Sequence, residues 1–272
     1  MAGSPADTLR IWLDFDGTLV GPNVAIILVE EFAHDGKRVA HEIDLDLHSG
    51  KISLRQAWER QVALLPADRM EEMAQWAVRN TPFRPGAKEL LDMLRRHAVP
   101  TSIVSGGLDF YITPILAHAG IDLPVFSDAL TFQPPASLVL SHPYGHATCR
   151  LCGICKAQTV LTAPPDGRRS VFIGDGSTDK YAAEVADLVF ARKRLATYCE
   201  ASGIPFYRFD EFGPVTEQLR RWIEAGEPLP PGRRRGLASS PCPISQSMFA
   251  SGKPFAPASA GSAGTAPVGT RP

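Results

Sequence analysis

The stretch that most constrains this chain is Ile11 to Val20, which reads Ile-Trp-Leu-Asp-Phe-Asp-Gly-Thr-Leu-Val. An apolar run bounded by a glycine turn is typical of a buried strand. Asp14 and Asp16 close this run, at the end of the strand where open α/β sheets bind ligands. Two carboxylates so close together are costly unless water or a cation surrounds them. A hard cation such as Mg²⁺ would resolve the repulsion, although an ordinary surface turn also accounts for Asp and Gly here.

Composition excludes several classes of function. The 272 residues are 44% hydrophobic, which is enough to bury a full core. A formal net charge of −1 gives no general attraction to nucleic acid or to an anionic membrane. No apolar run approaches the roughly 18 residues of a membrane span, and Met1 to Arg10 lacks the pattern of a secretory signal. We therefore expect no nucleic-acid partner, no membrane association and a cytoplasmic location, while the oligomeric state stays open.

Strand and helix patterns alternate along most of the chain, which predicts an α/β fold. We expect a doubly wound, mostly parallel sheet with helices on both faces. Residues 23–81 interrupt this alternation because their patterns are helical throughout, with Ser53 and Asp68 as predicted N-caps. Residues 130–144 are extended or form a hairpin. The predicted domains are a core at 1–22 and 82–225, a helical cap at 23–81, and a disordered tail rich in Pro, Gly, Ser and Ala at 226–272.

Two later strands also end in polar residues. The strand before Ser105 continues into Gly106, and the strand before Gly174 continues into Asp175-Gly-Ser-Thr-Asp179. Lys156 opens a helix just before this last strand. If the strands are neighbours, their ends place four carboxylates, a hydroxyl and one ammonium in a single pocket.

These residues in this order resemble the four motifs of the haloacid dehalogenase-like (HAD) phosphohydrolase superfamily. The resemblance covers roughly Leu9 to Ile223 and implies an α/β Rossmann-like core with an inserted cap. It implies that Asp14 is a nucleophile that forms an aspartyl phosphate, and that Asp16 protonates the leaving group and then activates water. Asp16 also argues for a phosphatase over a dehalogenase, because dehalogenases of this superfamily lack the second aspartate.

The same resemblance implies a Mg²⁺ site and a phosphate site. The metal would be held by Asp14, the backbone carbonyl of Asp16 and Asp175, with Asp179 in support. Ser105 and the N–H of Gly106 would hold phosphate oxygens, and Lys156 would offset negative charge. The residues implied are thus Asp14, Asp16, Asp175 and Asp179 for the metal, and Ser105, Gly106 and Lys156 for the phosphate.

The position of the cap resembles the phosphoserine phosphatase subgroup, with two departures. Asn23 stands where that subgroup carries an acidic residue for the substrate amine, and Glu59 stands where it carries a cap arginine, although Arg55 or Arg60 is near enough to substitute. The runs Ala-Leu-Leu-Pro and Cys-Gly-Ile-Cys-Lys look more like MtnX-type enzymes, which hydrolyse 2-hydroxy-3-keto-5-methylthiopentenyl-1-phosphate in methionine salvage. Phosphocholine and phosphoethanolamine phosphatases share a cysteine-rich segment before their lysine.

Three cysteines spaced by two residues precede the lysine. Thiolates and a histidine can form a tetrahedral Zn²⁺ site, which would be structural, whereas reduced thiols packed around the turn are the alternative. The candidate zinc ligands are Cys149, Cys152, Cys155 and His146.

The sequence as a whole predicts a Mg²⁺-dependent HAD phosphatase that acts on a small phosphorylated metabolite. An MtnX-type substrate is favoured, with phosphoserine and phosphocholine or phosphoethanolamine as alternatives. A phosphotransferase, or a protein that binds phosphate without turnover, is the alternative of another class.

Overall fold

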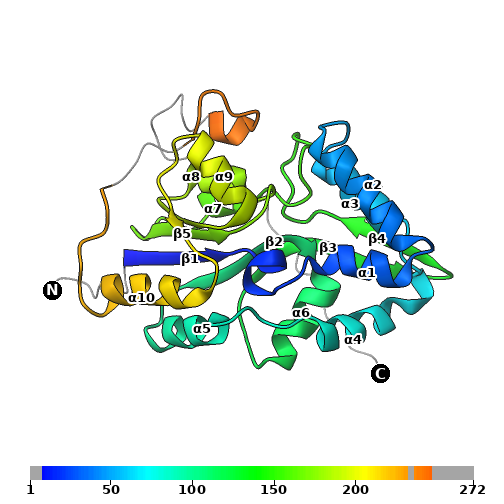
Figure 1. Ribbon diagram of the computed structural model, residues 1–272, viewed down its shortest axis with the longest axis horizontal. Coiled ribbons are helices and arrows are strands. Elements are labelled where there is room, and N and C mark those ends of the chain that lie inside the picture. Colours follow the sequence, from blue (N-terminus) through cyan, green and yellow to red (C-terminus); the bar gives the residue numbers. More distant parts are fainter. Residues whose placement is uncertain (1–7, 232–235, 247–272) are drawn as a thin grey trace, which may run out of the picture.

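The protein, described from a computed structural model at residues 8–231 and 236–246, is built around a seven-stranded sheet (Figure 1). The strand order is β4-β3-β2-β1-β5-β6-β7, and every neighbouring pair is parallel except β3 and β4. This confirms the predicted α/β fold with a mostly parallel sheet. The strands are β1 (Leu9–Leu13), β2 (Thr101–Leu108), β3 (Val125–Gln133), β4 (Ser137–Ser141), β5 (Arg169–Gly174), β6 (Leu188–Ala191) and β7 (Tyr207–Arg208).

Helices cover both faces of the sheet, as expected for crossovers between parallel strands. Side chains of β1 alternate between the two cores, with Ile11 and Leu13 on one face and Trp12 on the other. All three are at most 3% exposed, so the central strand is buried on both sides. Helices α5 (Ala87–Arg96), α6 (Asp109–His118) and α10 (Phe212–Ile223) cover the first face, and α7 (Lys156–Leu161), α8 (Lys180–Val185) and α9 (Lys193–Ala201) cover the second (Figure 1).

Four helices occupy the segment predicted as the cap. Ser53 begins α3 with a reciprocal capping box, in which its hydroxyl accepts the Gln56 N–H and Gln56 accepts the Ser53 N–H. Asp68 is not the cap of the last helix, because a 3₁₀ turn at Ala67–Arg69 precedes it. The division into core and cap stays a prediction. The four helices are α1 (Val24–Phe32), α2 (Gly36–His48), α3 (Leu54–Val62) and α4 (Met70–Asn80).

Residues 130–144 form most of an antiparallel hairpin. Strands β3 and β4 pair from Ala129–Ser141 to Gln133–Ser137, and the chain turns between them at Pro134 and Pro135. This hairpin extends the edge of the sheet toward α3 (Figure 1). Across residues 8–231 and 236–246, no helix is both long and apolar enough to cross a membrane.

Part of the segment predicted to be disordered packs on the core. Residues 236–246 place Cys242 and Ile244 in the hydrophobic cluster beneath α7, α8 and α9, each at 5% exposure. The Gly236 N–H donates to the backbone oxygen of Glu184 at 2.6 Å. The prediction of disorder is therefore wrong for this stretch, because two apolar side chains suffice to anchor it. Residues 232–235 and 247–272 lie outside the described residues.

Replacing Ile244 tests this docking. Ile244→Ala removes buried apolar volume from the core on the second face of the sheet, so we expect the free energy of unfolding to fall by about 2 kcal/mol, at the low end for such changes. Denaturant titration with matched m-values measures it. Leu45→Ala, at a side chain that is 54% exposed, is the control and should change stability little. Equal stability of both variants would mean that the segment does not pack.

Candidate active site

The carboxyl ends of β1, β2 and β5 meet at one edge of the sheet. Leu13 pairs with Ile103 of β2 and with Ile173 of β5, so the residues that follow the three strands are brought together. The Asp14 N–H donates to the backbone oxygen of Ile173 at 2.9 Å, which continues the ladder by one residue. Asp14 is therefore fixed by the sheet, and its side chain is buried.

Lys156 links Asp14 to Asp179. Its Nζ lies 2.6 Å from Oδ1 of each carboxylate, and all three side chains are at most 4% exposed. Burial opposes the charged ammonium, yet the two carboxylates raise the pKa of Lys156 above its ordinary range. The lysine is therefore a permanent cation that joins the β1 end, the first turn of α7 and the loop after β5.

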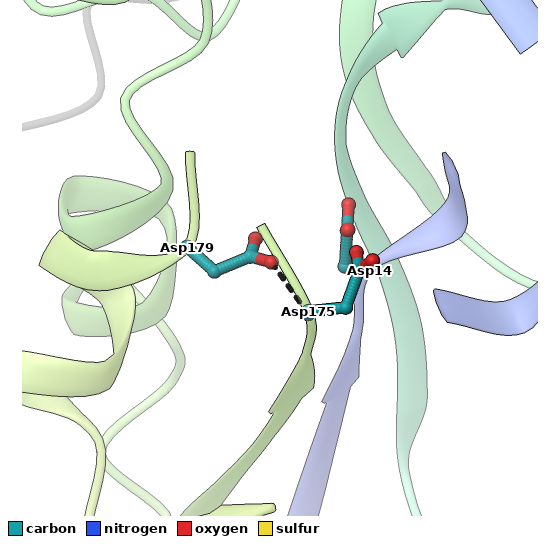
Figure 2. A group of neighbouring side chains, drawn as sticks. All are labelled: Asp14, Asp175 and Asp179. Carbon is teal, nitrogen blue, oxygen red and sulfur yellow. Dashed lines mark hydrogen bonds between the residues drawn. The ribbon is translucent and has the colours of Figure 1, made fainter. Parts of the chain in front are cut away.

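Three carboxylates share this buried edge. Oxygens of Asp14, Asp175 and Asp179 lie within 4.8 Å of one another, and Figure 2 shows them converging from neighbouring segments. Asp179 Oδ2 accepts the N–H groups of Asp175, at 2.9 Å, and Gly176, at 2.8 Å. Burial and the negative charge of Asp179 raise the pKa of Asp14 well above its ordinary value, against the pull of Lys156. Burial likewise raises the pKa of Asp175.

This donor set fits a hard divalent cation. Lys156 and the half-exposed Lys193, whose Nζ lies 3.5 Å from Asp175 Oδ2, offset at most two of the three negative charges, so the ionised cluster can take further positive charge. All the ligand atoms are oxygens, which suits Mg²⁺ rather than a soft metal. The buried Thr18 hydroxyl bridges Asp14 and Asp175. Its Oγ1 donates to Asp175 Oδ1 at 3.0 Å and lies 3.3 Å from Asp14 Oδ2.

The Asp16 side chain turns away from the three carboxylates. Its Oδ1 accepts the Val24 N–H at 2.8 Å, and its Oδ2 accepts the hydroxyl of Tyr111 at 2.7 Å. Burial raises the pKa of Asp16 to about 6, although both hydrogen bonds favour the carboxylate. The Asp16 carboxyl thus bonds to Val24 and Tyr111 and not to the three clustered carboxylates. With its raised pKa, it can exchange a proton near neutral pH.

Close packing around Asp16 and Asp175 leaves no room for a side chain at Gly107 and Gly17. A Cβ on Gly107 would lie 2.3 Å from Asp16 Oδ2 and 2.2 Å from the Tyr111 hydroxyl. Gly17 has φ +74°, and its Cβ would lie 2.6 Å from Asp175 Oδ2. Only glycine fits at either position.

A cavity of about 620 Å³ opens above this edge of the sheet. Ser105, Gly106 and Gly107 line it from the core, and Ser105 Oγ accepts the Gly107 N–H at 3.0 Å. Lys156 is not among the described residues that line it, so the lysine reaches the site through Asp14 rather than through the cavity wall. Side chains from α1, α2 and α3 form the opposite wall.

Four residues of the site carry no motif that identifies them in the sequence. Tyr111 lies 95 residues from its partner Asp16. Arg84 and Arg192 both donate to the backbone oxygen of Gly17 at 2.8 Å, and Lys193 Nζ lies 3.5 Å from Asp175 Oδ2. Each is positioned by tertiary contacts rather than by sequence spacing.

The predicted zinc ligands Cys149, Cys152, Cys155 and His146 all line one small cavity. In the part of the chain that the structure describes, no three ligand atoms of Cys149, Cys152, Cys155 and His146 lie within 4.8 Å of one another. Burial raises the pKa of Cys152 to about 12 and that of Cys155 to about 11. A further thiol, Cys242, lines the same cavity, whose volume is about 20 Å³. Both the structural zinc site and the alternative of reduced thiols packed around the turn that leads to Lys156 stay predictions.

The fold and the site define a class of enzyme. The model of the haloacid dehalogenase-like hydrolase family matches residues 11–184, and the chain belongs to this family. It is therefore a hydrolase of the HAD type, as the motifs predicted.

The chain is similar to named phosphatases in sequence and in fold. The chain is 31% identical to a 2-hydroxy-3-keto-5-methylthiopentenyl-1-phosphate phosphatase from Exiguobacterium sibiricum, over 78% of this chain and 97% of the relative. It is 26% identical to the protein of that name from Bacillus cereus, over 80% and 98%. Among solved structures, a phospho-aspartyl intermediate analogue of phosphoserine phosphatase aligns with a TM-score of 0.60 at 21% identity, over 78% of this chain and 98% of the other. The phosphoserine phosphatase of T. onnurineus also gives 0.60, at 15% identity, over 81% and 98%.

Tyr111 provides a test of how Asp16 is positioned. Tyr111→Phe removes the hydroxyl that donates to Asp16, so we expect kcat for alkyl phosphate esters to fall about tenfold. An aryl ester with a good leaving group should be much less affected, because its departure needs little protonation. Tyr207→Phe, on β7 against Phe190, is the matched control. Equal losses on both ester types would contradict a role through Asp16.

Proposed function

We propose that this hydrolase is a Mg²⁺-dependent phosphomonoesterase that acts on a small metabolite through an aspartyl phosphate. The observation that carries the proposal is the separation of two aspartates, the buried Asp14 and the partly buried Asp16. Asp14 is paired with Lys156 beside Asp175, while Asp16 is held apart by Tyr111. One carboxylate is thereby equipped as a nucleophile and the other as an acid and base.

The proposed reaction has two displacements at phosphorus. A carboxylate oxygen of Asp14 attacks, the ester P–O bond breaks, and Asp16 gives its proton to the departing oxygen. Asp16 then takes a proton from water as that water attacks the phosphoryl group, and the bond to Asp14 breaks to release inorganic phosphate. Mg²⁺ held by Asp14, the backbone carbonyl of Asp16 and Asp175 would neutralise phosphoryl charge, with Asp179 in support.

An MtnX-type substrate is supported by the relatives' names and by the cavity. The helices of the predicted cap contribute an apolar wall, which suits a methylthioalkyl chain better than a zwitterion. The two relatives cited above are named for the methylthiopentenyl phosphate. The apolar wall consists of Ile26, Ile43, Leu47, Leu54 and Ala57.

Phosphoserine fits this cavity less well. Asn23 Oδ1 accepts the Ile26 N–H at 3.2 Å and so caps α1. Arg55 pairs with Glu59, and Arg60 pairs with Asp46, each at 3.1 Å. Neither arginine is among the described residues that line the cavity, so no cation of α3 is offered to a substrate carboxylate.

A second candidate is phosphocholine or phosphoethanolamine. Glu30 and Asp44 line the cavity from the predicted cap and would attract a cationic head group. Asp44 lies 3.9 Å from Arg194, which partly offsets its charge.

A substrate panel tests the proposal. The methylthiopentenyl enol phosphate, phosphoserine, phosphocholine and phosphoethanolamine are incubated with and without Mg²⁺, and phosphate release is measured. We expect turnover that requires Mg²⁺, is fastest on the enol phosphate, and falls about 10³-fold or more in Asp14→Asn. Trapping of an aspartyl phosphate with transfer to an alcohol rather than to water would instead indicate a phosphotransferase. A folded protein that binds phosphate without turnover would contradict both.

The acid role of Asp16 has its own signature. In Asp16→Asn, alkyl esters should lose about 10²-fold or more in kcat, while p-nitrophenyl phosphate loses much less in the first step. A burst of p-nitrophenol followed by slow turnover is expected, because the same residue activates water. Absence of both the burst and the leaving-group dependence would argue against Asp16 as the proton donor.

A further inference from the structure

The indole of Trp58 faces the active-site cavity from the cap side. Trp58 lies on α3, is 6% exposed and lines the cavity together with Ser105 and Gly106. Its Nε1 lies 3.8 Å from the position that a Cβ on Gly106 would occupy. This N–H has no hydrogen-bond partner within residues 8–231 and 236–246.

A buried N–H without an acceptor is destabilising, so such groups are rare unless a ligand or water completes them. Trp12 Nε1 also lacks a partner in the described ranges, but it belongs to the core cluster beneath α7 and α8 and does not line the cavity. Trp58 differs because its N–H lies beside Gly106 of β2, the residue that follows Ser105. The Nε1 atom is buried in this structure, so an acceptor reaches it by entering between the indole and Gly106.

The fold fixes this indole against the core. The first turn of α3 begins at the Ser53 capping box, and the Arg55 N–H donates to the backbone oxygen of Leu151 at 3.3 Å. Leu151 belongs to the loop that leads to Lys156. One helical turn after Arg55, Trp58 lies above Gly106, so one backbone contact ties the cap indole to the lysine loop.

We propose that Trp58 Nε1–H donates a hydrogen bond to a phosphoryl oxygen of the bound phosphomonoester. The inference rests on the proposed function, because it places the phosphoryl group at Ser105 and Gly106. The charged side chains that the cap helices present to the cavity, Glu30 and Asp44, are acidic and repel a phosphoryl group. The indole N–H is a neutral donor that can approach it from this side.

This contact distinguishes phosphate recognition from recognition of the organic group. A donor to the phosphoryl oxygen contributes equally to every phosphomonoester and to inorganic phosphate. A donor to the organic part would act on one substrate alone.

Two tryptophan variants provide the test. Trp58→Phe keeps an aromatic ring and removes the N–H. Trp76→Phe is the matched control, because Trp76 lies on α4, packs edge-on against Phe32 and is outside the cavity lining. In the presence of Mg²⁺, we expect Trp58→Phe to raise both the inhibition constant of inorganic phosphate and KM for two unrelated esters about tenfold, with kcat little changed. Trp76→Phe should leave all of these values near wild type.

A titration of the wild-type protein tests the proposal even if the Trp58→Phe variant does not fold. The chain has four tryptophans, hence four indole N–H signals in a ¹H–¹⁵N spectrum. Adding inorganic phosphate with Mg²⁺ should shift the signal that Trp58→Phe removes, and not the one that Trp76→Phe removes. If Trp58→Phe does not fold, a phosphate titration in which no indole signal moves still overturns the proposal.

The outcomes separate this inference from the proposed function. A shifted Trp58 signal in a protein that hydrolyses no ester would support the phosphate contact and refute the phosphatase. Normal ester hydrolysis with equal inhibition constants in the two variants would refute the contact alone. A raised KM for one ester only, with unchanged phosphate inhibition, would overturn the proposal in favour of contact with the organic group.

Discussion

The rest of the site depends on one buried ion pair network, in which Lys156 lies between Asp14 and Asp179. Removing one member of such a network typically costs about 3–5 kcal/mol, because the remaining charges stay buried without a partner. The network also joins three segments that are distant in sequence, namely the β1 end, the start of α7 and the loop after β5. The same ammonium that keeps Asp14 beside Asp179 therefore holds the proposed nucleophile in position. The acidic cluster shares its charge with Lys156, with Lys193 beside Asp175 and with the metal that we propose.

The sequence predicted this edge of the sheet because parallel strands impose it. Once β1, β2 and β5 are neighbours, Asp14 and Asp175, which follow β1 and β5, must meet Ser105, which lies in the second half of β2. The N-cap at Ser53 was also predicted, because its hydrogen bonds involve a residue only three positions away. Most of the core and its polar residues could therefore be predicted, because they follow from local residue patterns and from the alternation of strands and helices.

Features that arise from packing between distant segments could not be predicted from the sequence. The hydroxyl of Tyr111 looks like part of an apolar helix until the fold brings it to Asp16. Residues 236–246 lack periodicity, yet Cys242 and Ile244 find an apolar surface. In each case the deciding contact spans many residues and leaves no local pattern.

The same distinction explains why the reaction is easier to infer than the substrate. The residues that we propose act on phosphorus are placed by the ladder that joins β1, β2 and β5. Residues that face the organic group come from helices whose charged side chains mostly pair with one another, as Arg55 does with Glu59 and Arg60 with Asp46. What α3 offers the cavity is then an apolar surface, the N–H of Trp58 and the amide of Gln61. A wall of this kind selects by shape and by exclusion of water, and a local motif in the sequence records neither property.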